Sequence, residues 1–555
     1  MKKILLIILT VFALSCKQNP NPKEETQKDT KIPFVWEGAN IYFLLTDRFK
    51  NGDTLNDVNF DRTKATGKLR GFEGGDIKGI TQKVKDGYFT DLGINAIWMT
   101  PIVEQIHGST DEGTGNSYAY HGYWAKDWTQ IDPNFGTEED LQELVDEAHS
   151  RGIRIILDAV VNHTGPVTEK DLVWPEEWVR TGKTCTYDNY ENTISCNLVE
   201  NLPDIKTESD ENVDLPPQLV KKWKAEGRYD QEMAELDAFF ERTGHPRAPR
   251  FYIMKWLADY ITEFGIDGYR VDTVKHTEEY VWQEFKAECD YAFNEFKTKN
   301  PDKVLDENKF YLVGEVYNYN ISSGQLYDFG DKTVNYFNPS SFHSLINFEF
   351  KWNAKQMPQQ EMFHKYDSIL NTSLKGFGTL NYLTSHDDGN PFDKQREKTF
   401  ETATKLLLSP GTSQVYYGDE SARPLDIKGT EGDATLRSFM NWDDIKNDKQ
   451  TQDILTHWQK LGQFRAKHPA VGAGNHLLLS QSPFIFKRNF MKDDFSDEVV
   501  IGLGLTKGKK IVEVSEVFED GILLHEAYSS QDIEVIDGEA VMDSQFEIIL
   551  LEHKN

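Results

Sequence analysis

The stretch GYRVDTVKH, residues 268–276, decides the fold of this chain. Its apolar residues Tyr269 and Val271 alternate with Arg270 and Asp272, so a buried strand would present Arg270 and Asp272 on one face. An arginine this close favours the ionised carboxylate and typically lowers the pKa of an aspartate by about 1 to 3 units. An ionised aspartate at the C-terminal end of a strand is suited to act as a nucleophile.

Two more acidic groups follow strand-like runs later in the chain. The apolar run 310–313 leads to Glu315, and the run 380–383 leads to His386 and Asp387. A parallel barrel presents its reactive side chains at the C-terminal ends of its strands. An ionised aspartate, a glutamate that can carry a proton and a third acid beside a histidine form the set that a retaining glycosidase uses.

Strand-like and helix-like runs alternate from residue 40 to residue 430, which predicts a parallel β/α architecture. Helix periodicity is clearest at residues 253–264, where apolar residues recur every three or four positions before Gly265. Eight strands with intervening helices make a (β/α)8 TIM barrel. The eight runs with strand character are residues 41–45, 96–99, 154–161, 269–274, 310–316, 345–350, 379–384 and 413–417.

Two parts of the chain depart from this alternation. Residues 163–250, after the third strand, are too long for a βα loop and predict an inserted domain. In residues 472–555, short alternating runs with glycine turns predict a C-terminal antiparallel β domain, a β-sandwich. The barrel is therefore expected to comprise residues 33–162 and 251–471.

The N-terminus has the pattern of a targeting segment. Two lysines precede an apolar run, residues 4–14, which has the length of an export signal and is too short to span a bilayer. A small residue directly before Cys16 resembles a lipoprotein cleavage box, so we expect a signal peptide at residues 1–16 and lipidation of Cys16; the alternative is plain secretion. The polar residues 17–32 predict a flexible tether.

The charge of the chain excludes some partners. With 61 basic and 91 acidic residues, the formal net charge is −30. That charge repels phosphate backbones and anionic lipid headgroups, so we expect no nucleic-acid partner and membrane contact only through the lipid anchor. A neutral polymer such as a glucan is not repelled. We expect a monomer.

Three cysteines remain after Cys16. Cys185 and Cys196 lie close together in a loop region of a chain that we expect to be exported, so they are expected to form a disulfide; two free thiols are the alternative. Cys289 falls on the apolar stripe of a predicted helix, which favours an inert buried thiol.

From about residue 34 to residue 470 the chain resembles the α-amylase family of glycoside hydrolases. Within that family it most resembles the bacterial periplasmic α-amylases. One matching block would be weak evidence for this family, whereas eight blocks in the order that the family has them are specific to it. The blocks are GINAIWMTP (93–101), AYHGYW (119–124), DAVVNH (158–163), LPDI (202–205), GYRVDTVKH (268–276), GEV around Glu315, SHD (385–387) and GTSQVYYGDE (411–420).

The resemblance implies roles for individual residues. Asp272 would be the nucleophile, Glu315 the general acid/base and Asp387 the third acid, which would accept hydrogen bonds from sugar hydroxyls. The implied substrate-binding residues are His121, Tyr123 as a stacking platform, Trp124, His163, Arg270, Lys275, His276 and His386. Each of these residues also has a purely structural explanation. Arg270 and Asp272 would form a buried ion pair that stabilises the barrel, the histidines would make all their hydrogen bonds within the protein, and Lys275 would be a solvated charge.

The resemblance also implies up to two calcium sites, since calcium takes about 6 to 8 oxygen ligands. One set joins the barrel to the inserted domain: Asn162, Asp204 and the carbonyl of His276. The second lies in the loop after the first strand: Asn51, Asp53, Asn56, Asp57, Asp76 and the carbonyl of Gly74. The alternative for this loop is an Asx-rich turn without a metal.

These observations predict retaining, endo-type hydrolysis of α-1,4-glucosidic bonds in starch, glycogen or malto-oligosaccharides, by an exported enzyme in the periplasm or anchored to the outer membrane. One alternative is a maltogenic, cyclodextrin-cleaving or glucan-transferring enzyme of the same family, because water and a sugar hydroxyl compete for one intermediate. Another is a non-catalytic glycan-binding lipoprotein on the same barrel.

Overall fold

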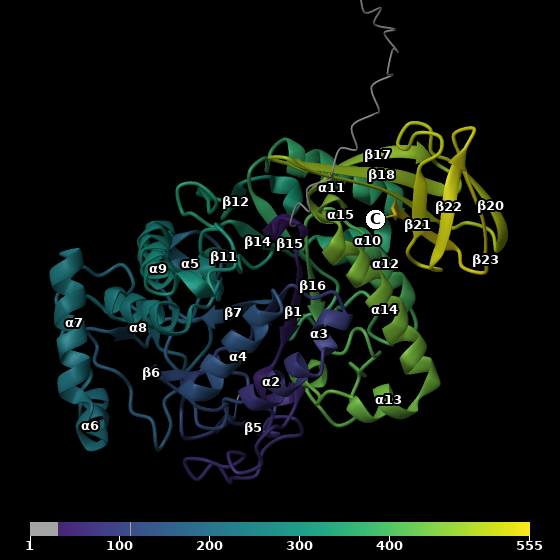
Figure 1. Cartoon of the computed structure of the whole chain (residues 1–555). Helices are drawn as coiled ribbons and strands as arrows, with labels where there is room; N and C mark the ends of the chain where they lie inside the picture. The colour runs from purple at the N-terminus through teal and green to yellow at the C-terminus, as the bar shows by residue number, and fades with distance from the viewer. Residues whose placement is uncertain (1–31, 112, 555) are drawn as a thin grey trace, which may run out of the picture. The chain divides into compact units, whose positions relative to one another are not determined.

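The structure is a computed structural model that describes residues 32–111 and 113–554 (Figure 1). The predicted signal peptide, the lipidation site Cys16 and all but the last residue of the predicted tether lie outside the described residues. Residues 33–555 form one compact unit. Within the described ranges no helix combines the length and apolarity needed to cross a membrane.

Eight parallel strands close into a barrel, and they follow one another around it in sequence order. Every residue of these strands is buried, as expected for a parallel sheet covered by helices. The predicted (β/α)8 fold is confirmed, and each of the eight predicted runs overlaps one strand. The strands are β1 (Asn40–Leu44), β2 (Ala96–Met99), β7 (Arg154–Ala159), β10 (Gly268–Val271), β11 (Tyr311–Gly314), β14 (Ser344–Asn347), β15 (Gly378–Tyr382) and β16 (Thr412–Tyr416).

Helix α8 (Pro249–Phe264) shows how the sequence sets the helix boundaries. A proline stands at its first position, where the missing N–H costs no hydrogen bond, and Gly265 ends it with a φ of 73°. The predicted apolar stripe of this helix is buried. The other main barrel helices are α2 (Ile77–Lys85), α4 (Glu138–Ser150), α9 (Glu279–Lys299), α10 (Phe350–Gln356), α11 (Gln359–Asn371), α12 (Thr399–Leu407) and α14 (Lys449–Lys467).

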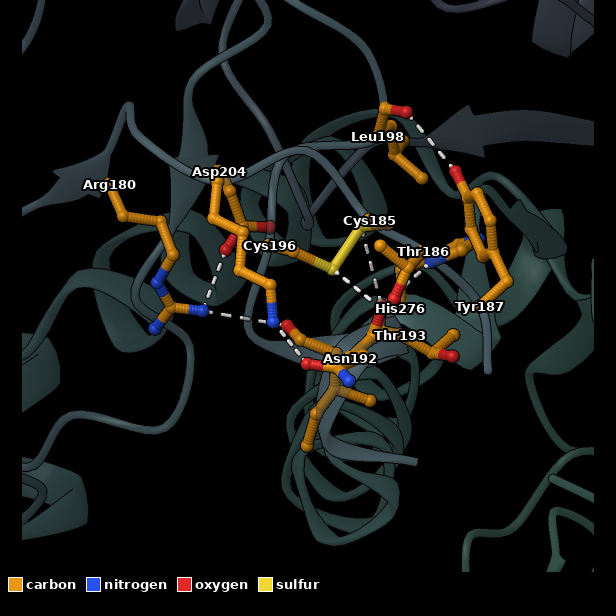
Figure 2. Close-up of a disulfide and its surroundings, with 12 residues drawn as sticks. Arg180, Cys185, Thr186, Tyr187, Asn192, Thr193, Cys196, Leu198, Asp204 and His276 are labelled. Carbon is orange, nitrogen blue, oxygen red and sulfur yellow. Dashed lines mark hydrogen bonds and ion pairs between the residues drawn. A yellow bond between two sulfur atoms is a disulfide. The ribbon is translucent and has the colours of Figure 1, made fainter. Parts of the chain in front are cut away.

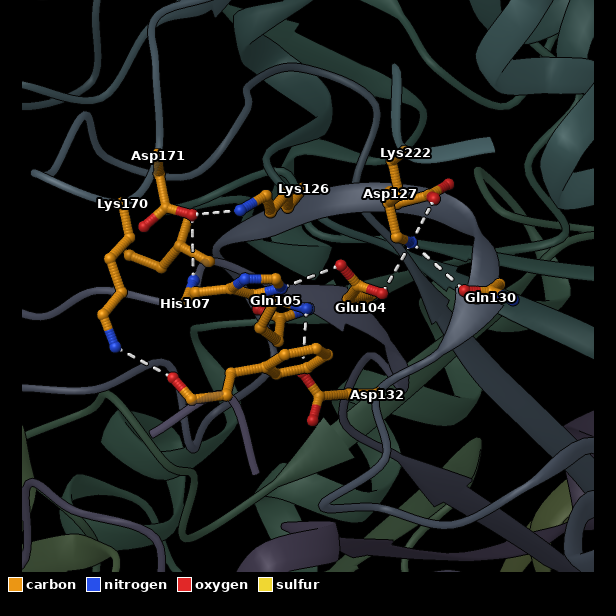
Figure 3. Close-up of polar contacts among 12 residues, drawn as sticks. Glu104, Gln105, His107, Lys126, Asp127, Gln130, Asp132, Lys170, Asp171 and Lys222 are labelled. Carbon is orange, nitrogen blue, oxygen red and sulfur yellow. Dashed lines mark hydrogen bonds and ion pairs between the residues drawn. The ribbon is translucent and has the colours of Figure 1, made fainter. Parts of the chain in front are cut away.

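The segment after β7 carries elements of its own. They are β8 (Val179–Arg180), α5 (Glu191–Ile194), β9 (Asp204–Ile205), α6 (Pro217–Glu226) and α7 (Tyr229–Thr243). Ion pairs tie this segment to the ribbon of β3 (Val103–Gln105) and β6 (Ala125–Ile131), as Figure 3 shows. Lys222 on α6 contacts Glu104 and Asp127, each over 2.6 Å, and Lys126 contacts Asp171 over 2.5 Å.

A C-terminal antiparallel β domain follows the barrel, as predicted. Its eight strands form one hydrogen-bonded sheet with a separate apolar cluster. Burial alternates along β20 and β22, so one face of each strand packs inward. The strands are β17 (Asn475–Ser480), β18 (Phe484–Lys492), β19 (Phe495–Leu503), β20 (Gly508–Glu513), β21 (Leu523–Glu526), β22 (Gln531–Ile536), β23 (Glu539–Ser544) and β24 (Ile548–His553).

Candidate active site

The three predicted carboxylates lie at the C-terminal ends of three barrel strands. Asp272 follows β10 directly, Glu315 follows β11, and Asp387 comes shortly after β15. Because the strands are parallel, these ends belong to one rim of the barrel. A small cavity at this rim is lined by residues from several strands, among them Arg270, Glu315 and Asp387.

Arg270 connects the carboxyl groups of this rim. Its Nη1 atom donates to Oδ1 of Asp272 over 2.6 Å and to Oδ1 of Asp158 over 2.9 Å. Its Nη2 atom lies 2.9 Å from Oε2 of Glu315. The arginine is 1% exposed, so one buried guanidinium contacts three carboxyl groups.

Asp158 is part of this network and was not among the predicted site residues. Besides Arg270, it accepts hydrogen bonds from the indole N–H of Trp98 (3.1 Å) and the hydroxyl of Tyr123 (2.8 Å). The only sequence signal was an acidic residue inside the apolar run of the third strand, at the start of the DAVVNH block. Its contact with three side chains depends on the closure of the barrel.

The surroundings of Glu315 favour its protonated form. Burial raises the pKa of Glu315 to about 8; Arg270 opposes this rise, whereas the charges of Asp272 and Asp387 add to it. The N–H of Thr273 donates to Oε2 of Glu315 over 2.9 Å. Thr273 has a φ of 49°, a rare conformation for a β-branched residue, so the backbone beside the acid is strained.

Asp387 is the most open of the three acids. Its side chain is 42% exposed, and its Oδ1 atom accepts a hydrogen bond from the hydroxyl of Ser385 over 2.7 Å. Partial burial opposes ionisation of Asp387, but His386, Ser385, Arg270 and Arg437 together lower its pKa. An ionised carboxylate that reaches solvent can accept hydrogen bonds from a sugar.

The predicted ring side chains take different places. The Tyr123 ring is nearly parallel to those of His386 and His121, with centroids 5.4 Å and 5.8 Å apart. His163 donates from Nε2 to the carbonyl of Tyr123 (3.1 Å), so this nitrogen supports Tyr123 within the protein. Trp124 is buried in a small apolar cluster, with 5% of its surface exposed, which leaves little of its ring to contact a ligand.

Lys275 and His276 lie beside the inserted segment. The ammonium group of Lys275 is 5.1 Å from the ring centroid of Tyr317 and 5.7 Å from that of Tyr187, and burial lowers its pKa to about 8. Nδ1 of His276 donates to the carbonyl of Thr193 over 2.9 Å. Burial also lowers the pKa of His276 to about 4, so its ring is neutral at physiological pH.

Thr193 belongs to a loop that is closed by a disulfide between Cys185 and Cys196 (Figure 2). The predicted pairing of these cysteines is thus confirmed, and Cys289 is buried and free as predicted. The loop brings Tyr187 and Thr193 against His276. The disulfide therefore constrains the loop that packs against Lys275 and His276.

The first predicted calcium set comes together around Asn162. The amide nitrogen of Asn162 donates to Oδ1 of Asp204 (2.8 Å) and to the carbonyl of His276 (3.0 Å). Arg180 lies 2.8 Å from the other oxygen of Asp204. This set offers few oxygens and already holds a positive charge at its carboxylate, so it fits a calcium ion less well than the second set.

In the second set, Oδ1 of Asn51 and Oδ1 of Asn56 are buried and have no hydrogen-bond partner among the described residues. The amide nitrogen of Asn51 donates to Asp57 over 2.8 Å. A Cβ atom on Gly74 would lie 2.5 Å from that nitrogen, so only glycine fits there. Unpartnered amide oxygens beside a carboxylate are suited to a hard cation.

The remaining two members of this set have partners within the protein. Asp76 is the N-cap of α2, where it accepts hydrogen bonds from the backbone N–H groups of Gly52, Asp53 and Gly79. The Asp53 side chain pairs with Lys78 over 2.9 Å. The structure thus brings Asn51, Asp57 and Gly74 into direct contact, and Asn56 directly precedes Asp57 in the chain.

A further ion-pair cluster lies near His386 and was not predicted. Asp433 contacts Arg70 over 3.1 Å and Arg437 over 2.5 Å, and Arg437 donates to the carbonyl of His386 over 2.9 Å. Arg70 and Asp433 also line a larger cavity on this side. These residues lie in loops without a strand pattern, so the sequence offered no position for them.

A parallel barrel whose rim joins three carboxyl groups through one arginine is the architecture of a glycoside hydrolase. Residues 43–469 match the family described as "Alpha amylase, catalytic domain". The chain belongs to the α-amylase family of glycoside hydrolases.

The chain is similar to several characterised proteins. It is 35% identical to the periplasmic α-amylase of Escherichia coli (strain K12) over 537 residues, which cover 86% of this chain and 74% of that protein. It is 25% identical to a cyclomaltodextrin glucanotransferase of Thermoanaerobacterium thermosulfurigenes, with 88% of this chain and 63% of that protein covered. Among solved structures, an Anoxybacillus α-amylase matches with a TM-score of 0.63 at 24% identity, over 94% of this chain and 100% of that chain.

Proposed function

We propose that the protein hydrolyses α-1,4-glucosidic bonds inside starch, glycogen or malto-oligosaccharides, with retention of the anomeric configuration. The observation that carries this proposal is the contact of one buried arginine with both Asp272 and Glu315 at the ends of adjacent strands. That contact supports a pair in which Asp272 acts as the nucleophile and Glu315 as the acid.

In the proposed reaction the two carboxyl groups act in turn. Glu315 starts protonated, because burial raises its pKa to about 8, and it gives its proton to the leaving glycosidic oxygen. The carboxylate of Asp272 attacks the anomeric carbon and forms a covalent glycosyl-enzyme. Glu315, now ionised, removes a proton from water, which attacks the same carbon and releases Asp272.

The remaining site residues would bind the sugar. Asp387 would accept hydrogen bonds from ring hydroxyls, and such bonds accelerate the reaction when they strengthen as the ring flattens toward an oxocarbenium ion. His121 accepts the N–H of Tyr123 at its Nδ1 atom over 3.1 Å, which leaves Nε2 as a donor for the sugar. The ring of Tyr123 would stack on the sugar face.

A second candidate function is glucan transfer or cyclodextrin cleavage. The exposed rings of Tyr187 and Tyr317 favour it, because both lie near Lys275 and exposed aromatic rings can stack on an acceptor sugar. A non-catalytic glycan-binding protein would bind glucan and release no reducing ends.

Product analysis on maltoheptaose, cyclodextrin and pullulan, with the product anomers followed by NMR, tests all three functions. We expect shorter malto-oligosaccharides that are initially α-anomers. Initial β-anomers would reject the retaining mechanism, and larger or cyclic products would favour transfer.

We further propose that the chain is exported, anchored by lipid at Cys16 and monomeric, and that calcium binds at the loop of Asn51, Asn56, Asp57 and Gly74. The similarity to a periplasmic α-amylase and the pattern of residues 1–16 support export. Mass spectrometry of the mature N-terminus tests the anchor, because lipidated Cys16 would be the first residue.

A further inference from the structure

Trp352 is the most exposed tryptophan of the chain. All 12 tryptophans lie within the described residues; Trp352 is 41% exposed, whereas the others are buried or only partly exposed. A single exposed apolar side chain needs no explanation by itself, so the surroundings of the ring decide what it can do.

The ring lies beside the loop that carries the third acid. Trp352 belongs to α10, which begins shortly after β14 ends, and the loop of residues 383–390 follows β15. β14 and β15 are neighbouring parallel strands. Both segments therefore leave the barrel at the rim where the candidate catalytic acids lie.

Two lysines of α10 connect the Trp352 ring to this loop. The ammonium group of Lys351 is 4.8 Å from the ring centroid and also pairs with Oδ2 of Asp388, the residue after the third acid. The ammonium group of Lys355 is 5.0 Å from the centroid and donates to the carbonyl of Asn390 over 3.2 Å. The ring is thus held next to residues 388–390.

The surface between Asp387 and Trp352 is accessible. Asp387, Gly389 and Asn390 are all exposed. A Cβ atom on Gly389 would meet nothing within 4 Å beyond its neighbours in the chain, so no described residue fills the space at this position. A sugar chain bound at Asp387 can therefore continue along this loop to the ring.

The same loop contacts the lining of the rim cavity. Phe348 and Tyr382 line that cavity, and their rings pack edge to face with centroids 5.7 Å apart. The hydroxyl of Tyr382 donates over 2.9 Å to Oδ2 of Asp388, the oxygen that also pairs with Lys351. These contacts fix the position of the Trp352 ring relative to the cavity.

The lysines do not by themselves require a tryptophan at this position. Lys351 has a carboxylate partner and Lys355 a carbonyl partner, and a cation–π contact at an exposed site contributes little. An indole held in place with much of its surface in water is, however, suited to stack on the apolar face of a sugar.

We propose that Trp352 is a specificity-determining residue, which stacks on a glucose unit outside the reacting centre and thereby favours long glucans over short ones. A neutral glucan brings no charge, so the ion pair of Lys351 with Asp388 stays in place when it binds. This inference rests on the proposed function and adds to it a binding position that uses none of the three acids.

The first test measures binding without turnover, in an Asp272→Asn background. Acrylamide quenches exposed tryptophans far more than buried ones, so the accessible part of the fluorescence should come chiefly from Trp352. Maltoheptaose should protect this part from quenching, and maltotriose should protect it less. Trp352→Phe in the same background should remove the sugar-dependent change. Quenching that bound maltoheptaose leaves unchanged would overturn the inference.

Kinetics give the second readout. In Trp352→Ala the ratio of kcat/KM for maltoheptaose to kcat/KM for maltotriose should fall about two- to tenfold, the usual size of one aromatic contact. Trp352→Tyr keeps an aromatic ring and should recover most of this ratio. A wild-type ratio in Trp352→Ala would also overturn the inference.

Tyr291→Ala is the matched control. Tyr291 is likewise an exposed ring (44%) beside a cation, with the guanidinium carbon of Arg242 3.9 Å from its centroid. It lies more than halfway along α9, about 18 Å from the helix end that follows β10. The control should leave the quenching and the ratio unchanged, and an effect equal to that of Trp352→Ala would count against the inference.

The two proposals fail separately. If the wild-type protein cleaves no glucan, the proposed function fails, and the quenching measurement still shows whether Trp352 contacts a glucan. If glucan is cleaved while the quenching and the ratio do not depend on Trp352, only this inference fails.

Discussion

Arg270 contacts Glu315 directly: Nη2 of the arginine lies 2.9 Å from Oε2 of the glutamate, and both residues are buried. The same guanidinium donates to Asp272 and to Asp158. The candidate acid and the candidate nucleophile thus share one counterion. A change in Arg270 acts on both residues at once.

Replacing Arg270 by methionine should abolish turnover and destabilise the fold. It would leave Asp158 and Asp272 buried without their counterion, and removing one partner of a buried ion pair typically costs about 3 to 5 kcal/mol. We expect kcat to fall by at least about 100-fold, since Asp272 and Glu315 would lose their common support. Activity assays and thermal unfolding measure the two effects.

Arg250→Met is the control for this variant. Arg250 is also buried, and it pairs with Asp210 and Glu284 instead of the acids of the rim. The Arg250→Met variant should be less stable than the wild type but should keep the wild-type turnover per folded molecule. Turnover close to that of the wild type in Arg270→Met would reject the proposed role of the arginine.

The rate should fall in alkali because Glu315 must carry a proton. Burial raises the pKa of Glu315 to about 8, so kcat/KM on maltoheptaose should decline above about pH 8 as the acid ionises. Glu315→Gln cannot exchange a proton and should lose about 100- to 10,000-fold in rate. Glu349→Gln, a change in a carboxyl that pairs with Lys365, should leave the profile unchanged. A decline that begins below pH 6 would contradict this assignment.

Calcium removal should lower the melting temperature through the Asn51 loop. A bound ion stabilises only the folded state, so a chelator in excess should lower Tm and added calcium should restore it. Asn51→Leu and Asn56→Leu remove the two unpartnered oxygens and should make Tm insensitive to the chelator. Asp53→Asn should retain much of the response, since Asp53 already pairs with Lys78. An unchanged Tm, with no calcium found by elemental analysis, would count against the ion.

The sequence predicted those features that depend on local pattern. Apolar runs of strand length located all eight barrel strands, and Asp272, Glu315 and Asp387 were predicted at one rim because each follows such a run. Strand ends carry the chemistry in this fold, so their place in the chain already implied their place at one rim.

Contacts between distant parts of the chain had no such signal. Asp158 accepts a hydrogen bond from Arg270, although 112 positions separate them in the sequence. The hydrogen bond from His163 to the Tyr123 backbone likewise joins two different loops. The Asx-rich loop illustrates a second limit, because calcium ligands and helix caps use the same residue types. Asp76 fits both patterns, and only the fold shows that it caps α2.

Removing the disulfide should loosen the loop that contacts Lys275 and His276. Cys185 and Cys196 close a short loop, for which the expected stabilisation is about 3 kcal/mol or less. The double change Cys185→Ser with Cys196→Ser should raise KM for long glucans more than for short ones, because the loop carries the Thr193 contact to His276. Cys289→Ala, which removes only a free buried thiol, is the control. Equal KM values in the double variant and the wild type would show that the loop keeps its conformation without the disulfide.

His468 joins the barrel to the C-terminal domain through two carboxylates. Following α14, it contacts Asp497 on β19 over 2.7 Å and Glu552 on β24 through its other ring nitrogen. Lys467 also contacts Glu552, over 2.7 Å. Burial alone would lower the pKa of His468, but hydrogen bonds and charge from Asp497 and Glu552 raise it above its usual value. The folded protein therefore holds this proton more tightly than the unfolded chain does.

This raised pKa predicts that the protein loses stability in alkali. The contribution of His468 should be complete below the pKa of an unfolded histidine, about 6.5, and should be lost as the pH rises through the folded value. The free energy of unfolding should fall more steeply from pH 6 to pH 9 in the wild type than in His468→Gln. His457→Gln, on α14, is the control: burial lowers the pKa of His457 to about 4, so its titration destabilises the fold on the acid side only. Parallel curves for the wild type and His468→Gln above pH 6 would show that the His468 proton is not held between the two domains.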